Sequence, residues 1–270
     1  GVFKGGNIES VMAEIKNNSV AGADAFDVHI SCLDKEKRTL EAIQKIVNCT
    51  GKPIMALHYN QSNDLTPMSE SDDERTEQLL MAAEAGVACI DMQGYTFETE
   101  ENTKATLKPE WTKDNMSFVS SLPNEVSLNP ETIKKQKEFI NAVHEKGCEV
   151  LLSTHTGCFL NCQQVIDLLD FLAERKPDIL KLITADCDTD EQVDEYCKTL
   201  LLVKNRYPDI KVTYFCNGKK TAQTRALGVL LGAHIGFCVE RYSELSAFSQ
   251  LPLEKSVQFC KLYQDLISLD

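Results

Sequence analysis

The 270-residue sequence contains no run of about 18 apolar residues, so no segment reads as an ordinary membrane-spanning helix. It also lacks an excess of basic residues, because 28 Lys and Arg stand against 41 Asp and Glu, which gives a formal net charge of -13. Proteins that bind nucleic acid or acidic membrane surfaces need clustered cations. We therefore expect a small-molecule partner, with no nucleic-acid and no membrane contact.

Several other signals are missing. No glycine-rich fingerprint follows an apolar run, which disfavours a dinucleotide-binding fold, and the first twenty residues lack a secretory pattern. The eleven cysteines are scattered without zinc-like spacing, which is typical of reduced thiols in the cytoplasm. Four of them lie in or beside apolar runs and are expected to be core residues: Cys89, Cys148, Cys216 and Cys238.

Short apolar runs alternate with longer amphipathic stretches along the whole chain, a pattern that predicts a parallel sheet covered by helices. The predicted strands cover residues 25–30, 53–59, 88–92, 149–154, 179–184, 211–215 and 234–238. The predicted helices cover residues 8–19, 39–48, 73–85, 130–146, 162–175, 191–205, 221–231 and 253–267.

One more strand would close a (β/α)8 barrel, and residues 1–4 are the candidate for a short or truncated first strand. We therefore predict an α/β fold, a single (β/α)8 TIM barrel domain over residues 1–270. The stretch from Gln93 to Leu128 is longer than an ordinary connection and contains the only tryptophan, Trp111. Residues 94–128 are thus an insertion after the fourth strand, either a surface excursion or a lid or partner contact.

Polar side chains stand near the carboxyl ends of several predicted strands, where the active sites of barrels lie. Asp27 and His29 are two residues apart in the first of the seven predicted runs, so they share a face of the sheet. His58 lies at the end of the next run. Asp91 and Gln93, again two apart, mark the end of the run that follows.

Lys181 lies inside the apolar run Ile179-Leu180-Lys181-Leu182-Ile183, where a buried ammonium group is costly. A partly neutral lysine is a nucleophile toward carbonyl groups, so Lys181 is a candidate for covalent catalysis. His155, at the end of the preceding predicted strand, is expected to face Lys181 and to transfer protons. The plainer alternatives are a lysine that reaches the barrel rim or pairs with a carboxylate, and a hydrogen-bonded rim histidine.

At this point the sequence resembles the type I 3-dehydroquinate dehydratases, a family of (β/α)8 barrels. The matching segments follow one another in the family's order, and none of them is decisive alone. They are Lys52-Pro53-Ile54, Ala85-Gly86-Val87 with Cys89-Ile90-Asp91, Ser153-Thr154-His155, Asp178-Ile179-Leu180-Lys181-Leu182, Gly218-Lys219 with Arg225, and Ser246-Ala247-Phe248-Ser249-Gln250.

The resemblance implies a carbon-oxygen lyase that dehydrates 3-dehydroquinate or a related cyclic hydroxy-keto acid. Lys181 would form a Schiff base, His155 would move the proton, and Arg225, Ser246 and Gln250 would bind the substrate carboxylate. No metal and no organic cofactor is needed. The resemblance further implies a cytoplasmic homodimer in the shikimate pathway of aromatic amino acid biosynthesis. Lys181 and Arg225 are the only candidate cationic pair for an anionic substrate.

The chain departs from the family pattern at other positions expected to bind substrate. The family's Glu-x-Arg appears as Asp27-x-His29, its next arginine as His58, and the glutamate that orients the catalytic histidine as Gln93. Two fixed cations are thereby lost, and the histidine loses a charged partner. We therefore expect poor activity on 3-dehydroquinate or a different hydroxy-keto acid as substrate.

Two alternatives belong to other classes. Asp27, His29, His58 and His155 could converge as metal ligands of a metal-dependent barrel lyase or hydrolase, although no tight HxH or HExxH spacing is present. The second alternative is a catalytically degenerate barrel that binds a small acid or a protein.

Overall fold

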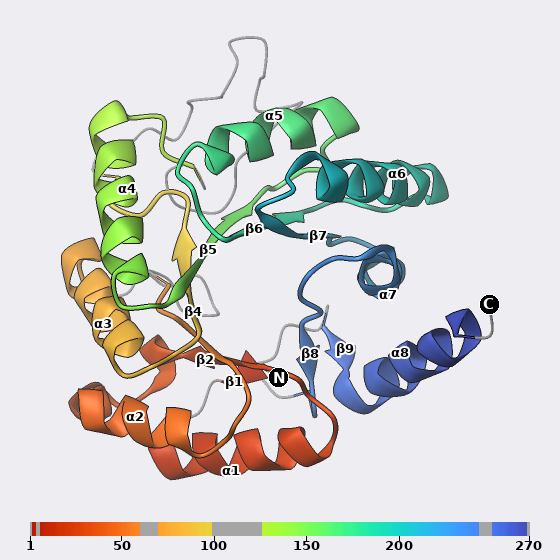
Figure 1. Cartoon of the computed structure of the whole chain (residues 1–270). Helices are drawn as coiled ribbons and strands as arrows, with labels where there is room; N and C mark the ends of the chain where they lie inside the picture. Colours follow the sequence, from red (N-terminus) through yellow and green to blue (C-terminus); the bar gives the residue numbers. More distant parts are fainter. Residues whose placement is uncertain (1, 4–5, 60–69, 99–125, 243–249, 269–270) are drawn as a thin grey trace. The chain divides into compact units, whose positions relative to one another are not determined.

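The computed structural model describes residues 2–3, 6–59, 70–98, 126–242 and 250–268 (Figure 1). Its contacts divide the chain into two compact units. The first unit comprises Gly1–Asp91, Ala142–Glu149 and Phe237–Asp270, and the second comprises Met92–Asn141 and Val150–Gly236. That residues 1–270 form a single domain stays a prediction.

The elements of the first unit are β1 (Val2–Phe3), α1 (Ile8–Val20), β2 (Phe26–His29), α2 (Leu40–Asn48), β3 (Ile54–Leu57), α3 (Asp72–Glu84), most of β4 (Cys89–Gln93), β8 (Cys238–Val239), β9 (Leu251–Pro252) and α8 (Leu253–Ile267). In this unit β1 to β4 pair in parallel in sequence order, and β1, β2 and β3 each lead to a helix, while β8 and β9 pair with each other. Two short 3-10 turns, η1 (Ile30–Cys32) and η2 (Lys35–Lys37), precede α2. Helix α2 packs against both α1 and α3 (Figure 1).

The second unit repeats this alternation. Its elements are most of α4 (Pro130–His144) and of β5 (Glu149–His155), then α5 (Cys162–Ala173), β6 (Ile179–Thr184), α6 (Asp190–Arg206), β7 (Lys211–Cys216) and α7 (Thr221–Leu231). Strand β6 pairs in parallel with β5 on one side and with β7 on the other. Helix α6 packs between α5 and α7 (Figure 1).

The helix ends agree with the sequence signals. Gly86 and Gly147 follow α3 and α4 with φ values of +96° and +74°, a conformation that glycine adopts without steric cost. The Asn129 side chain accepts a hydrogen bond of 3.0 Å from the Glu131 backbone, so Asn129 caps the helix that begins at Pro130. These stops confine each apolar run to one strand, and this is why most of the predicted bounds are confirmed.

The last predicted strand, residues 234–238, is wrong in extent, because β8 covers only Cys238–Val239. The backbone N–H of His234 donates to the Val212 carbonyl, but that of Ile235 donates to the Thr213 side-chain hydroxyl, at 3.0 Å. A side chain thus replaces the backbone acceptor that a regular ladder would use.

The core contains the predicted cysteines, since Cys89, Cys148, Cys216 and Cys238 are all buried. Within the described part of the chain, no helix is both long and apolar enough for a bilayer crossing.

Candidate functional site

A row of polar side chains crosses the sheet of the second unit. In the strand register Lys181 on β6 is paired with Ser153 on β5 and with Thr213 on β7. Paired residues of parallel strands point to the same face. All three are buried, with Lys181 7% exposed and the two hydroxyl residues 0%. The sheet therefore places an amine among small hydroxyl side chains, on strands whose other buried residues are mostly apolar.

Gln93 at the end of β4 extends this row. The Gly94 N–H donates to the Ser153 carbonyl at 2.8 Å, which is the bond expected when Gln93 and Ser153 are register partners. Gln93 is 5% exposed, and its Oε1 has no hydrogen-bond partner among the described residues. Gln93 thus brings an unused acceptor into the row that contains Lys181.

His155 lies on the same face of the sheet as Lys181. It is two residues beyond Ser153 on β5 and is paired with Ile183, which is two residues beyond Lys181 on β6. The histidine is half-buried, in contrast with Lys181. The two residues predicted as proton shuttle and nucleophile are therefore diagonal neighbours on adjacent strands.

Arg225 is held in α7, where it is 7% exposed. Its guanidinium carbon lies 5.3 Å from the centre of the Phe215 ring, and its Nη2 donates to the Asn217 Oδ1 at 3.3 Å. Phe215 is two residues beyond Thr213 on β7, so its ring lies on the face that carries Lys181. Arg225, the predicted carboxylate-binding residue, thus packs against a side chain on the face of the sheet that carries Lys181.

The loop before α7 is fixed by a close backbone contact at Gly218. Its φ is +137°, and a Cβ there would lie 2.5 Å from the Cys187 carbonyl oxygen. The Cys187 N–H donates to the Asn217 carbonyl, and the Lys220 N–H donates to the Cys187 carbonyl, each at 2.9 Å. These bonds connect the loop after β6 to the loop after β7, so Asn217, which contacts Arg225, is held by both.

In the first unit Asp27, His29 and Asp91 share one face. His29 is paired with Leu57, and Leu57 with Asp91, while Asp27 precedes His29 by two residues. The Asp27 and His29 side chains are 3.7 Å apart, and Asp27 Oδ1 is buried without a hydrogen-bond partner among the described residues. The Tyr59 hydroxyl donates to Asp91 at 3.0 Å, a contact that no pattern in the sequence indicates.

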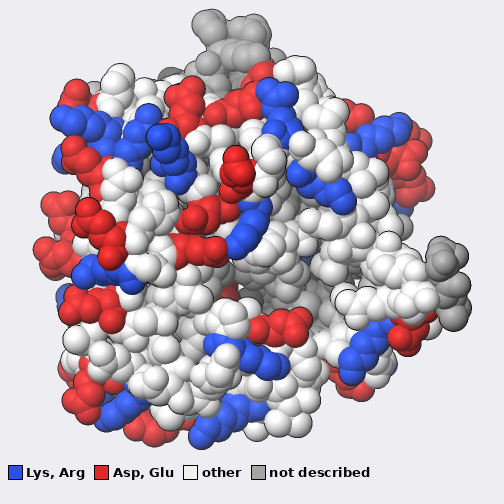
Figure 2. Space-filling model, viewed as in Figure 1, with Lys and Arg blue, Asp and Glu red and all other residues white. Residues whose placement is uncertain are grey.

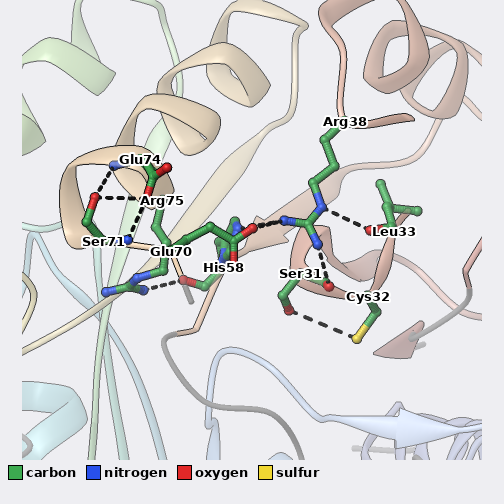
Figure 3. A network of polar contacts seen from close by, with 9 residues as sticks. All are labelled: Ser31, Cys32, Leu33, Arg38, His58, Glu70, Ser71, Glu74 and Arg75. Carbon is green, nitrogen blue, oxygen red and sulfur yellow. Dashed lines mark hydrogen bonds and ion pairs between the residues drawn. The ribbon is translucent and has the colours of Figure 1, made fainter. Parts of the chain in front are cut away.

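Charged side chains lie around His58 (Figure 3). Arg38 Nη1 lies 3.4 Å from His58 Nε2 and donates to Glu70 at 2.6 Å. Arg75 Nη1 donates to the His58 carbonyl at 2.5 Å, and Arg75 also pairs with Asp72. Burial, Arg75 and Arg38 together lower the pKa of His58 to about 4, so its ring is neutral at pH 7.

Two further buried cations lie here, each already paired with a carboxylate, so the expectation that Lys181 and Arg225 are the candidate pair for an anionic substrate stays a prediction. Arg38 and Arg75 are also buried, and they lie beside the histidine that was predicted to have replaced a fixed cation. Arg75 belongs to a polar stretch of α3 that resembles a solvated helix start. No local signal distinguishes it from an exposed arginine.

The remaining predicted residues lie in less defined surroundings. Ser246 is outside the described residues. Gln250 has a buried Oε1 with no hydrogen-bond partner among the described residues. Most of the insertion 94–128 also lies outside the described part. Its two ends, which we call its base, are joined by a hydrogen bond of 3.0 Å from the Ser127 N–H to the Gly94 carbonyl.

A buried arginine secures that base. Gln136 Nε2 donates to the Gly94 and Thr96 carbonyls, each at 2.9 Å, and Gln136 Oε1 accepts from Arg175 Nε at 2.7 Å. Arg175 Nη2 donates to the Ser127 carbonyl at 2.9 Å. Both ends of the insertion are thereby bonded, one to helix α4 and the other to Arg175, two residues beyond the end of α5.

The metal alternative receives no support from the geometry. Over the described ranges, no three His, Cys, Asp or Glu side chains are grouped so that they could hold a metal ion. Figure 2 shows acidic and basic side chains intermixed over the face in view, rather than a basic surface for nucleic acid.

Two of three comparisons with known proteins give matches, and both include type I 3-dehydroquinases. The family model described as type I 3-dehydroquinase matches residues 3–267. Among proteins with curated descriptions, none matches significantly. Among solved structures, 3-dehydroquinate dehydratase from Geobacillus kaustophilus matches with a TM-score of 0.72 and 15% identity, covering 98% of this chain and 90% of that one.

Two further structures define how far this likeness extends. Type I 3-dehydroquinate dehydratase from Clostridium difficile, with covalently modified comenic acid, matches with a TM-score of 0.72 and 14% identity, over 98% of this chain and 91% of that one. HMG-CoA lyase from Bacillus subtilis matches with a TM-score of 0.58 and 14% identity, over 95% and 79%. At such identities the likeness shows the fold alone, and the predicted (β/α)8 barrel architecture is confirmed.

Proposed function

Because the chain belongs to the type I 3-dehydroquinase family, a family of hydro-lyases, we propose that it dehydrates 3-dehydroquinate or a related cyclic hydroxy-keto acid through an imine on Lys181. The observation that carries this proposal is the strand register, which places Lys181 between Ser153 and Thr213 on the face that also bears His155. Its role in the shikimate pathway is part of the same proposal.

The reaction needs only groups of the chain. The neutral amine of Lys181 attacks the substrate ketone, and loss of water gives an iminium ion. His155 removes a proton from the carbon next to the iminium carbon, which leaves an enamine. The enamine expels the β-hydroxyl as His155 returns the proton to it, so that water departs. Hydrolysis of the remaining iminium ion frees the product and Lys181.

Arg225 supplies the charge that holds the substrate carboxylate in this proposal. Its guanidinium is buried beside the ring of Phe215, which restricts where the planar fork of donors can point. The resemblance also assigns substrate contacts to Ser246, Gln250 and Asp27, and to His29 and His58. Those contacts stay predictions, to be tested by their effect on KM.

Gln93 is expected to limit the rate. The resemblance places a glutamate there to orient the catalytic histidine, whereas Gln93 Oε1 has no partner among the described residues. A carboxylate would orient the imidazolium form of His155 and stabilise it. Gln93→Glu should therefore raise kcat for 3-dehydroquinate about tenfold if this substrate is the right one. An unchanged or lower kcat would point to a different substrate.

Trapping with borohydride tests the imine. The protein is incubated with 3-dehydroquinate, reduced with sodium borohydride and digested, and mass spectrometry should find the adduct on the peptide that contains Lys181. Lys181→Arg should abolish the adduct. Lys211→Arg, which changes an exposed lysine at the start of the neighbouring strand β7, is the matched control and should retain it.

The outcomes separate the alternatives. An adduct on Lys181 with turnover supports the proposal, whereas turnover without an adduct would contradict the imine mechanism. If neither adduct nor turnover is found with 3-dehydroquinate or related cyclic keto acids, the degenerate binding barrel is favoured instead. A homodimer and a cytoplasmic location stay predictions, which sedimentation and cell fractionation would check.

A further inference from the structure

Two buried thiols meet in the second unit, at the carboxyl ends of the neighbouring strands β6 and β7 (Figure 1). Cys187 lies in the loop after β6, and Cys216 is the last residue of β7. Both are free cysteines that are 0% exposed, and their side chains are hydrogen-bonded to each other. Two thiols in direct contact are the starting arrangement for a disulfide.

The backbone around the two thiols holds them in this contact. The Cys187 N–H donates to the Asn217 carbonyl, and the Lys220 N–H donates to the Cys187 carbonyl, each at 2.9 Å. Gly218 lies so close to Cys187 that a Cβ there would be 2.5 Å from the Cys187 carbonyl oxygen. Because the loops are already tied together, a bond between the two sulfur atoms needs only a small further approach.

The two thiols differ in their electrostatic surroundings. The hydrogen bond with Cys216 and the charge of Lys220 lower the pKa of Cys187, although burial and Asp188 oppose the shift. Burial and the same hydrogen bond hold the pKa of Cys216 well above its ordinary value. The thiolate is the nucleophile in thiol chemistry, so Cys187 is expected to react first and Cys216 second.

The segment that covers Cys187 is a short surface loop. Cys187 stands between Asp186, which is exposed, and Asp188, which is half-buried. Asp186 has a φ of +55°, an uncommon conformation for a residue with a Cβ. Surface loops open locally at a much lower free energy than the core does. A small oxidant such as hydrogen peroxide can therefore reach Cys187 without global unfolding.

We propose that Cys187 and Cys216 are a redox-active pair that a hydroperoxide oxidises to a disulfide. The Cys187 thiolate attacks one oxygen of hydrogen peroxide, the O–O bond breaks, and a sulfenic acid and hydroxide form. The Cys216 sulfur then attacks the sulfenic sulfur, the S–S bond forms, and the hydroxyl group leaves as water with the Cys216 proton. Each sulfur loses one electron, and the peroxide gains the two.

The modification would lie beside the site described above. Asn217 follows Cys216 directly, and its Oδ1 accepts a hydrogen bond from Arg225. The inference does not depend on the proposed function, since the chemistry uses only the two thiols and the peroxide.

Peptide mapping of the full chain tests the disulfide. The protein is treated with hydrogen peroxide, denatured, alkylated and digested. Two of the eleven thiols should resist alkylation, and mass spectrometry should find the peptides of Cys187 and Cys216 joined. Dithiothreitol should restore both thiols. Cys158→Ser is the matched control, because Cys158 and Cys162 are the closest pair in the sequence, and it should retain the same disulfide.

Two variants test the order of the steps. In Cys216→Ser the second thiol is missing, so dimedone, which reacts with sulfenic acids, should label Cys187 after peroxide treatment. In Cys187→Ser the Cys216 thiol should stay unlabelled, since burial keeps it protonated. Circular dichroism checks that both variants are folded, and the mapping of the wild type needs neither of them.

Several results would overturn the proposal. These are a disulfide between other cysteines, two reduced thiols at a peroxide concentration that oxidises half-buried Cys158, and a dimedone label on Cys216 in Cys187→Ser. Borohydride trapping on Lys181 is carried out on reduced protein, so its failure would contradict the imine and leave the thiol pair unaffected.

Discussion

The first unit holds the guanidinium of Arg38 against the carboxylate of Glu70, whereas the second unit holds that of Arg175 among uncharged oxygens. Arg175 is 1% exposed and donates to the Gln136 amide and to the carbonyls of Phe171 and Ser127. Its guanidinium also lies 4.5 Å from the centre of the Phe171 ring. Burial lowers the pKa of Arg175 to about 10, so it is still charged at pH 7.

The difference shows two uses of a buried cation. In the first unit the cation is neutralised and fixes the position of an imidazole. In the second unit the cation serves as a multiple donor that satisfies backbone carbonyls where a long insertion leaves the fold. The first use depends on charge, and the second depends mainly on the geometry of the hydrogen bonds.

The largest effect is expected from Arg175→Met. The substitution leaves the Gln136 amide oxygen and the Ser127 carbonyl buried without their donor, so the free energy of unfolding should fall by about 3–5 kcal/mol. Urea titration followed by circular dichroism measures it. Arg206→Met, which breaks an exposed ion pair with Asp170, is the control and should cost much less, because solvent screens such a pair. Equal losses in the two variants would contradict the claim that the buried hydrogen bonds of Arg175 stabilise the fold more than an exposed ion pair does.

The second-largest effect is expected from acid, which should lower the free energy of unfolding through His58 in the first unit. The folded pKa of His58 is about 4, below its ordinary value of 6.5, so the unfolded chain takes up a proton first as the pH falls. The contribution of this group is complete above pH 6.5 and is lost as the pH falls toward 4, by up to about 3 kcal/mol. The loss should be smaller in His58→Gln, measured as the difference in unfolding free energy between pH 7 and pH 4.5.

The facing charges define what would contradict this prediction. Arg38 and Arg75 oppose protonation of His58, and Glu70 favours it. If wild type and His58→Gln lose stability in parallel over this range, then the imidazole is not the group that titrates.

A smaller effect is expected from Glu70→Gln. The amide can still accept from Arg38, but the countercharge is lost, so the free energy of unfolding should fall by about 2 kcal/mol. Glu41→Gln removes the exposed carboxylate that pairs with Lys45 and should have a much smaller effect, because solvent screens this pair. A comparable cost for both would mean that charge matters as little for Arg38 as for Arg175.

Removal of residues 99–125 should have the smallest effect. The side chains of Glu98 and Ser127 are hydrogen-bonded, so the two ends of the deletion already lie close together. A direct peptide link from Glu98 to Val126 therefore needs little rearrangement. We expect the free energy of unfolding to change by less than about 1 kcal/mol, and the borohydride adduct on Lys181 to form as before. Loss of the fold would show that the base depends on the deleted segment.

The strands and helices could largely be predicted because their limits are set locally. Strand β6, Ile179–Thr184, coincides with the predicted residues, since an apolar run stops at polar residues on both sides. Strand β8 was overestimated because the acceptor for the Ile235 N–H is a side chain of another strand. Apolar periodicity carries no information on such long-range bonds.

The site shows the same limit. Lys181 stands out because a charged residue interrupts a buried strand, and the sequence contains that contrast directly. Arg38, Arg75 and Arg175 do not stand out, because each is held partly by a partner 17 to 48 residues away. Sequence patterns thus indicate a polar residue in an apolar strand, and they miss a charge that tertiary contacts bury.

The close contact at Gly218 restricts how this protein can vary. No residue with a Cβ fits beside the Cys187 backbone, so this position is closed to neutral drift unless the loop after β6 moves as well. Any change that moved Cys187 would also displace Asn217 and the guanidinium bonded to it. The orientation of Arg225 therefore depends on both the loop after β6 and the loop after β7. A change in the anion that Arg225 binds would require substitutions in both loops at once.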